Sequence, residues 1–412
     1  MFKRISGTKD ILPEETSSWQ TVEATARKIF SFYNYQEIRT PIIEEASLFN
    51  RTLGATTEIV QKQMFLIHNQ EDTYALRPEG TASIVRSYLE NKLEKTSGFT
   101  KLYYIGPMFR LERPQKGRLR QFHHIGAEAI GSDLASLDIE IISLAEQLLK
   151  SFGITGYQIK INSLGCPKDK QALSAALKKN LTEKLTQLCA DCQLRAKNNV
   201  LRILDCKNKD CQKIVKTLEL KHAHLCPDCL EHFEEVKYGL NNLGIPFQVT
   251  PQLVRGLDYY NRTVFEITHS DLGSQDAIGA GGRYNNLVQQ LGGPELGAIG
   301  FAFGVERLLL VPNTLKQNPP KKLVYLITLG AAAKSTGIKI LNQLRNAQIP
   351  ADMDYLNKSL KGAMRAANDT GATFVLILGD DELKNNMIAL KDMAQGTQRQ
   401  VAIENLTEEL KC

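Results

Sequence analysis

The segment 106–128 constrains the fold of this chain more than any other. An apolar run ends at Arg110, a turn carries Pro114 and Gly117, and Gln121–Glu128 alternates between polar and apolar side chains. Alternation with a period of two on both sides of a turn that contains proline and glycine predicts two antiparallel strands. The segment is therefore interpreted as strand, loop and strand.

Five basic side chains lie within this hairpin, and their arrangement indicates a ligand. Arg110 stands at the mouth of the hairpin, where its planar guanidinium offers several donors to a phosphate. Glu128, on the returning strand, can accept a hydrogen bond from an amine. The pair predicts a nucleotide and an amino-containing substrate side by side. The alternative is a basic hairpin that only faces water.

Two further segments favour the ligand-binding interpretation. Small residues recur through 297–304, which lets a backbone or a ligand approach closely, and Arg307 then opens the following helix. Helix N-termini favour anions, so Arg307 is interpreted as a second phosphate ligand. The third segment holds Arg255 close to Asp258, and a plain ion pair between these two is the alternative to a catalytic arginine.

Composition places the chain among ordinary globular proteins. Of 412 residues, 42% are hydrophobic and 23% charged, which suits two or three domains. No run approaches the roughly 18 consecutive apolar residues of a membrane span, and the first residues lack the apolar stretch of a signal peptide. We therefore expect a cytoplasmic protein without a membrane partner. The net charge of +6 is compatible with nucleic acid but does not require it.

The N-terminal part of the chain alternates between helical and extended patterns. Residues 15–35 have a helical period with Thr16 or Ser17 as its cap, and a strand is expected at 36–44. A lysine-rich and cysteine-rich helical region at 168–235 is interpreted as an insertion.

The C-terminal part begins after the clearest linker, 312–320. Short continuous apolar runs at 323–328 and 374–379 are typical of buried parallel strands, and helical patterns lie beside them. They predict a separate α/β domain.

Taken together, these segments resemble class II aminoacyl-tRNA synthetases and, among them, the histidyl-tRNA synthetase family. The hairpin is similar to motif 2 of this class, and 297–310 is similar to motif 3. The match covers nearly the whole chain. Its other segments are Thr40-Pro41 as motif 1, Arg77-Pro-Glu79-Gly-Thr81, the histidine signatures Arg255-Gly-Leu-Asp-Tyr-Tyr260 and Gly281-Gly-Arg283-Tyr284, and Lys358-Ser-Leu-Lys-Gly.

This resemblance implies an α/β protein of two parts. Residues 1–318 would form an α+β catalytic domain on an antiparallel sheet, the class II synthetase fold, with the small helical insertion 168–235 inside it. Residues 321–412 would form an α/β anticodon-binding domain. In this class the first helix and the strand after it form a dimer interface, so a homodimer is expected.

The resemblance also implies a reaction, the ATP-dependent ligation of L-histidine to tRNA(His) through histidyl-adenylate, with Mg²⁺ accompanying ATP. The carboxylate and the phosphate are both negative, so the reaction needs positive charge and alignment. The implied catalytic residues are Arg255, which Asp258 would orient, and Arg110. The implied ATP-binding residues are Arg110, Glu112, Arg118 and Arg307, and Arg113 and Gln115 would contact the tRNA acceptor end.

Selection of histidine needs a carboxylate for the ammonium group and polar partners for the imidazole. The family's contacts correspond to Glu79, Thr81, Arg110, His124, Glu128, Arg255 and Tyr260. Of these, Glu79 and Thr81 match the ammonium contacts, whereas Glu128 and Tyr260 match the imidazole contacts. His124 departs from the family, which is expected to carry glutamine there. An imidazole can donate as an amide does, but its protonation state then matters.

Two other functions fit parts of this pattern. One is a regulatory subunit, such as the synthetase-like protein that controls ATP phosphoribosyltransferase, which lacks an anticodon-binding domain and degrades the signature residues. Here Arg110, Arg255 and Arg307 are all present, and a C-terminal domain follows them. The other is a class II enzyme for a different amino acid, which the signature 255–260 opposes.

Six of the eight cysteines lie inside the insertion. Two CxxC pairs have the spacing of tetrahedral zinc ligands, which a cytosolic protein favours over disulfides. The preferred ligands of this structural zinc are Cys189, Cys192, Cys226 and Cys229. The alternative is a set of reduced cysteines that act as small apolar residues.

Overall fold

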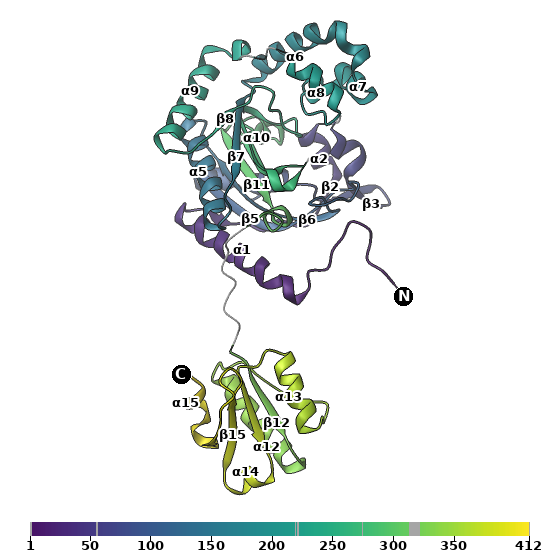
Figure 1. Ribbon diagram of the computed structural model, residues 1–412. Helices are drawn as coiled ribbons and strands as arrows, with labels where there is room; N and C mark the ends of the chain where they lie inside the picture. The colour runs from purple at the N-terminus through teal and green to yellow at the C-terminus, as the bar shows by residue number, and fades with distance from the viewer. Residues whose placement is uncertain are drawn as a thin grey trace. The chain divides into compact units, whose positions relative to one another are not determined.

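The computed structural model describes residues 2–54, 57–218, 220, 222–273, 275–312 and 322–411. The chain forms two compact units, Met1–Gln317 and Asn318–Cys412. Each unit has its own sheet and hydrophobic core (Figure 1). The expected linker 312–320 lies outside the described residues, apart from Pro312.

The first unit is built on a large mixed sheet that has eight strands within the described residues. From one edge to the other they are β1 (Gln36–Glu37), β5 (Thr100–Phe109), β6 (Gln121–Ile130), β11 (Ala298–Gly304), β10 (Ala277–Arg283), β9 (Asn261–His269), β7 (Tyr157–Ser163) and β8 (Gln248–Val249). Neighbouring strands are antiparallel, except that β1 runs parallel to β5 and β8 parallel to β7. The expected class II fold is confirmed.

The predicted hairpin is confirmed by β5 and β6, which pair from Thr100 opposite Ile130 to Phe109 opposite Gln121. In its loop, Gln115 and Arg118 exchange two backbone hydrogen bonds, and Gly117 has a φ of +73°. This left-handed conformation favours glycine. The turn residues therefore fix the place where the strands reverse.

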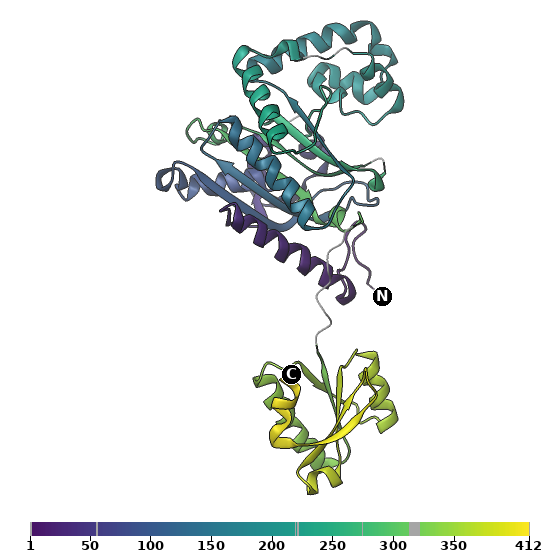
Figure 2. The same cartoon turned by 60° about the vertical axis from the view of Figure 1, so that its left-hand side comes forward.

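Three helices cover one face of the large sheet and form its main core. They are α1 (Pro13–Phe32), α5 (Ala135–Ser151) and α9 (Pro227–Asn242), of which α1 and α5 lie side by side (Figure 2). The cap expected at Thr16 or Ser17 was wrong. The helix begins at Pro13, whose missing N–H costs nothing in the first turn.

A three-stranded sheet and several short helices form a second core. The strands that the structure describes there are β2 (Ile43–Glu45), β4 (Asp72–Leu76) and β3 (Phe65–Asn69), and the helices are α2 (Ala46–Leu53), η1 (Ile59–Gln63), α3 (Thr81–Glu90), α4 (Leu93–Thr96) and α10 (Leu287–Gln290). The single strand expected at 36–44 was wrong. It is divided between two sheets, because Pro41 has no N–H to continue a ladder.

The insertion is helical, as expected, and has a small core of its own. Its elements are α6 (Pro167–Leu181), η2 (Thr182–Gln187), α7 (Ala190–Asn198), η3 (Val200–Ile203), α8 (Lys209–Lys216), η4 (His222–His224) and the start of α9. Further along α9, Phe233, Val236 and Leu240 belong to the core of the large sheet. The helix α9 therefore connects the insertion to the catalytic sheet.

The second unit is an α/β domain with one core on each face of its sheet. The described strands are, in spatial order, β13 (Ala351–Met353), β12 (Val324–Thr328), β14 (Phe374–Leu378), β15 (Met387–Asp392) and β16 (Gln398–Ala402). The helices are α12 (Ala331–Asn346), α13 (Leu360–Asp369), α14 (Asp380–Lys384), η6 (Ile403–Asn405) and α15 (Leu406–Lys411). The parallel pairing of β12 and β14 confirms the buried strands that the apolar runs predicted.

Among the helices that the structure describes in both units, none combines the length and the apolar character needed to cross a membrane.

Candidate active site

A pocket on the large sheet brings together the residues expected to bind ATP and histidine. It lies over β6, β9, β10 and β11 and is closed by the motif 2 loop and the loop before β9. Every residue predicted for these two ligands lines it except Glu128, namely Glu79, Thr81, Arg110, Glu112, Arg118, His124, Arg255, Tyr260 and Arg307. Their individual roles remain predictions.

Glu128 lies directly behind Thr81 and is almost fully buried. Its carboxyl accepts hydrogen bonds from the hydroxyls of Thr81 (2.7 Å) and Tyr284 (2.6 Å). A Cβ atom on Gly300 would lie 1.7 Å from its Oε2, so this strand position must be glycine. Burial raises the pKa of Glu128 to about 8, although the two hydroxyl donors oppose the shift. Near neutral pH this carboxyl is therefore largely protonated.

Glu79 is buried at the start of α3. It accepts from the backbone N–H groups of Thr81 (2.7 Å) and Ala82 (2.9 Å), which have no partner inside the helix. Burial raises the pKa of Glu79, while these donors and Arg110 oppose the shift. Because Glu79 also lines the pocket, the carboxylate can meet a substrate ammonium there.

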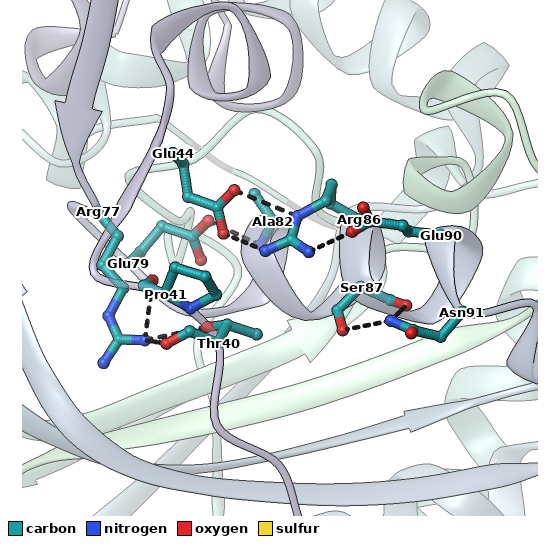
Figure 3. A network of polar contacts seen from close by, with 10 residues as sticks. All are labelled: Thr40, Pro41, Glu44, Arg77, Glu79, Ala82, Arg86, Ser87, Glu90 and Asn91. Atoms are coloured by element: carbon teal, nitrogen blue, oxygen red, sulfur yellow. Dashed lines mark hydrogen bonds and ion pairs between the residues drawn. The ribbon is translucent and has the colours of Figure 1, made fainter.

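Motif 1 holds the loop that carries Glu79. Arg77 donates to both the carbonyl (2.9 Å) and the hydroxyl (3.0 Å) of Thr40 (Figure 3). It also donates to the carbonyl of Pro107 (2.9 Å). Further along, Arg86 of α3 pairs with Glu44 of β2 at 2.5 Å. These contacts fix the backbone on both sides of Glu79. Thr40 therefore supports the site indirectly, by holding the Arg77 side chain.

Three charged residues of motif 2 form a chain of contacts, in which Glu112 lies between Arg110 and Arg118. Arg110 donates from Nε to the carbonyl of Pro78 (2.9 Å), and its Nη1 lies 3.9 Å from Glu112, which also pairs with Arg118 at 3.2 Å. Arg113 and Gln115 are exposed in the loop and do not line the pocket. They are therefore open to a large ligand such as RNA.

Arg307 approaches the motif 2 loop from the opposite side. It donates to the carbonyls of Gly117 (2.9 Å) and Ala277 (2.5 Å). The helix that it was expected to open, α11 (Val305–Leu308), has four residues and places Arg307 third. So short a helix carries little dipole, and the guanidinium itself must supply the positive charge.

Arg255 is held by Glu266 of β9 and not by Asp258, so the expected orienting residue was wrong. The distance from Arg255 Nη1 to Glu266 Oε2 is 2.5 Å. Asp258 instead faces the insertion, where it accepts from Asn199 (3.1 Å) and Arg202 (3.2 Å). Those two donors engage the Asp258 carboxylate, whereas Glu266 lies on the pocket face of its strand.

His124 and Tyr260 are both neutral near physiological pH. Burial, together with Arg110 and Arg307, lowers the pKa of His124 to about 3. The imidazole therefore offers one donor and one acceptor, which answers the question raised by its replacement of glutamine. Burial raises the pKa of Tyr260 to about 12, with Arg255 opposing the shift, so its phenol keeps its proton.

Several pocket residues were missed by the sequence interpretation, among them Tyr104, Asp205, Lys207 and Glu266. Asp205 and Lys207 come from the insertion, for which the sequence predicted helices and zinc ligands but no contribution to the pocket. Tyr104 lies within an apolar strand and was therefore overlooked. The signal for it is a pair of glycines, Gly80 and Gly126, that leave room for its ring. A Cβ on Gly80 or Gly126 would lie 2.6 or 2.5 Å from its ring.

The expected zinc ligand set, Cys189, Cys192, Cys226 and Cys229, was wrong. Each CxxC pair lies at the start of a different helix, and each is grouped with different metal-ligating side chains. Cys189 and Cys192 group with Cys206 and Cys211, whereas Cys226 and Cys229 group with Cys166 and Asp169. The seven cysteines among the described residues are free of disulfides.

Comparison with known proteins agrees with this fold and pocket. Residues 7–308 match the family model for histidyl-tRNA synthetase, and residues 323–412 match that for an anticodon-binding domain. Histidine–tRNA ligases from Halothermothrix orenii and Syntrophotalea carbinolica are 46% and 43% identical to the chain, which covers 98% and 97% of their lengths. Both alignments cover 98% of this chain.

Solved structures show the same relationship. The apo histidyl-tRNA synthetase of S. aureus superimposes with a TM-score of 0.82 at 36% identity, over 100% of both chains. The largely antiparallel sheet with motifs 2 and 3 around one pocket is that of the class II aminoacyl-tRNA synthetases. Within this class, the chain belongs to the histidyl-tRNA synthetase family.

Proposed function

We propose that the pocket forms histidyl-adenylate from L-histidine and ATP with Mg²⁺ and then transfers histidine to tRNA(His). The family charges tRNA(His) with histidine at the expense of ATP. The proposal rests on one observation, that Arg110, Arg255 and the buried carboxyl of Glu79 line the same pocket. Glu128 lies directly behind the pocket wall, where it contacts Thr81.

Histidine is placed by groups on two sides of the pocket. Its ammonium binds Glu79 and Thr81, and its imidazole binds Glu128 and Tyr260. Its carboxylate lies towards Arg110, His124 and Arg255. A buried site that offers this many polar partners rejects side chains that cannot engage them, because the unpaired groups would remain desolvated.

ATP is placed by the basic residues of motifs 2 and 3. Arg110 and Arg255 face the α-phosphate from opposite sides, and Arg307 binds the γ-phosphate. Glu112 and Arg118 complete the ATP site. Positive charge held in place before the reaction stabilises the pentacovalent α-phosphate without reorganisation, so these arginines both align the substrates and lower the barrier.

The tRNA contacts both parts of the chain. Arg113 and Gln115, exposed in the motif 2 loop, contact the acceptor end, and residues 321–412 bind the anticodon. The matched anticodon-binding model at 323–412 supports the second contact. Residues 1–318 then form the catalytic domain, with 168–235 as an insertion within it.

We further infer a cytoplasmic homodimer that uses the first helix and motif 1. Large apolar side chains are exposed in this region, among them Phe32, Ile42, Ile43 and Leu66. Burying them in a dimer removes apolar surface from water. Light scattering of the protein with Ile43→Lys, compared with Leu243→Lys on the exposed end of α9, tests this interface.

We also infer that the cysteine-rich insertion binds structural zinc.

The adenylate itself tests the proposed function. Protein mixed with ATP, Mg²⁺ and histidine, then separated rapidly from small molecules, should carry histidyl-adenylate detectable by mass spectrometry. Addition of tRNA(His) should discharge it to charged tRNA. Protein that binds histidine but never yields the adenylate would instead behave as a regulatory subunit.

A further inference from the structure

Four cysteines of the insertion surround a common point. Cys189 precedes α7 and Cys192 lies in its first turn, Cys206 follows η3, and Cys211 lies in α8. Their four sulfur atoms lie within 4.8 Å of one another, and Sγ of Cys189 is 3.9 Å from Sγ of Cys206. Tetrahedral zinc with bonds of about 2.3 Å places its sulfurs about 3.8 Å apart. The spacing of this four-cysteine group therefore fits one zinc ion.

Backbone donors are directed at these sulfurs. The N–H of Cys189 donates to Sγ of Cys211 (3.2 Å), and the N–H of Asn208 donates to Sγ of Cys206 (3.4 Å). Metal ligands are commonly held by such outer hydrogen bonds, which orient them and stabilise their negative charge. Thiols that acted only as apolar filling would gain little from these donors.

A second group joins the two ends of the insertion. It consists of Cys166 and Asp169 at the start of α6, and of Cys226 and Cys229 at the start of α9. The ligand atoms again lie within 4.8 Å of one another. Asp169 accepts from the N–H groups of Cys166 and Cys226, one at each carboxylate oxygen and both at 3.1 Å. Each oxygen keeps a lone pair that can bind a metal.

We propose that the insertion holds two separate zinc ions, one in the four-cysteine group and one in the cysteine–aspartate group. The first stabilises the small core of the insertion, which includes Cys192, Cys206 and Cys211. The second fastens α6 to α9 where the insertion leaves the catalytic sheet.

Both zinc sites are connected to the pocket, and this part of the inference rests on the proposed function. Lys170, next to Asp169, donates to the carbonyls of Asp258 (3.0 Å) and Tyr260 (2.8 Å) in the histidine signature. Cys206 lies between Asp205 and Lys207, which line the pocket. The metals therefore position the loop that carries Arg255 without touching the substrates.

Zinc content of the full-length protein, purified without chelator, tests the inference. We expect about two zinc ions per chain. Cys206→Ser should remove the first ion and Cys226→Ser the second, so each variant should keep about one. Cys412→Ser, which changes the cysteine at the end of the sequence and outside the insertion, is the matched control and should keep both. About one ion or less in the wild type, or a group variant that keeps both, would overturn the two-site inference.

Cobalt provides a second measurement that does not depend on the variants folding. The metal-free full-length protein should take up two equivalents of Co²⁺ and develop thiolate-to-cobalt charge-transfer absorption throughout the titration. Absorption that stops after one equivalent, or never appears, contradicts the inference.

Histidine-dependent pyrophosphate exchange on the same samples separates this inference from the proposed function. An active protein without zinc contradicts only the zinc sites. A zinc-loaded protein that does not exchange pyrophosphate contradicts only the proposed function.

Discussion

Arg255 and Glu266 form an ion pair inside the pocket, with 2.5 Å between Nη1 and Oε2. Glu266 lies on a strand of the large sheet, whereas Arg255 lies on the loop before it. The rigid strand therefore fixes the direction of a guanidinium that would otherwise follow its loop. A positively charged group held in this way supports a role in stabilising the α-phosphate.

Arg255→Ala should leave the fold and ATP binding largely intact but reduce adenylation by about a hundredfold, or about 2.7 kcal/mol. The reason is that the variant loses a donor that acts mainly in the transition state. Pyrophosphate exchange measures the loss, and nucleotide binding by calorimetry checks the pocket. Asp258→Asn, in the same signature but directed at the insertion, is the control and should lose much less. Exchange by Arg255→Ala near the wild-type rate would remove Arg255 from the mechanism.

Histidine binding should be tightest between about pH 6.5, where free imidazole titrates, and about pH 8, where Glu128 titrates. In this window Glu128 is protonated and the substrate imidazole is neutral. The complex needs one proton between these two groups, and Glu128 already carries it, so binding neither takes up nor releases a proton. Above the window binding must take up a proton, and below it binding must release one. The KM for histidine should therefore rise on both sides.

Glu128→Gln isolates the upper limb of this pH profile. The ratio of its KM to that of the wild type should fall above pH 8, because only the wild type loses a proton there. Taking the ratio cancels the titrations of histidine itself. A ratio that stays constant from pH 6 to pH 9 would show that Glu128 does not carry the shared proton.

His124→Gln should preserve most of the activity. The pKa of His124 is about 3, so the imidazole is neutral and offers hydrogen bonds much as an amide does. His124→Leu, of similar size but without polar atoms, should raise the KM for histidine by roughly tenfold or more, since a substrate oxygen would lose its partner. If both variants behave alike, His124 makes no polar contact with the substrate.

Local patterns predicted the hairpin well, whereas contacts between distant residues escaped them. Period-two alternation with Pro114 and Gly117 is a short-range signal, and β5 and β6 follow it. The partner of Arg255 is different. Asp258 is the nearest carboxylate in sequence, but strand β9 turns Glu266 towards the pocket, and Asn199 and Arg202 of the insertion take Asp258. Only the tertiary fold decides between the two.

The cysteines show the same limit. A CxxC pair predicts two metal ligands from one turn of the chain, but it does not indicate which other residues complete the coordination of the metal. In the fold Cys166 and Asp169, which precede the first CxxC pair in sequence, lie beside the second pair, Cys226 and Cys229.

The raised pKa of Glu128 could not be predicted from the sequence either, because it results from burial beneath Thr81, Tyr284 and Gly300.

Deleting residues 321–412 should spare adenylation and weaken the charging of tRNA with a GUG anticodon. The C-terminal unit has its own cores, so its removal leaves the main core of the catalytic part intact. Pyrophosphate exchange and charging at limiting tRNA, measured on the same preparations, give the comparison. Equal charging by the truncated and complete proteins would contradict the assignment of this unit to the anticodon.

The most direct test is pyrophosphate exchange by the wild-type protein with each of the twenty amino acids in turn. The arrangement of Glu79, Glu128 and Arg255 in and beside one pocket predicts exchange with histidine and little with any other, including glutamine and asparagine. Exchange driven by a different amino acid, or by none in protein that is folded and binds ATP, would contradict the claim that this pocket activates histidine.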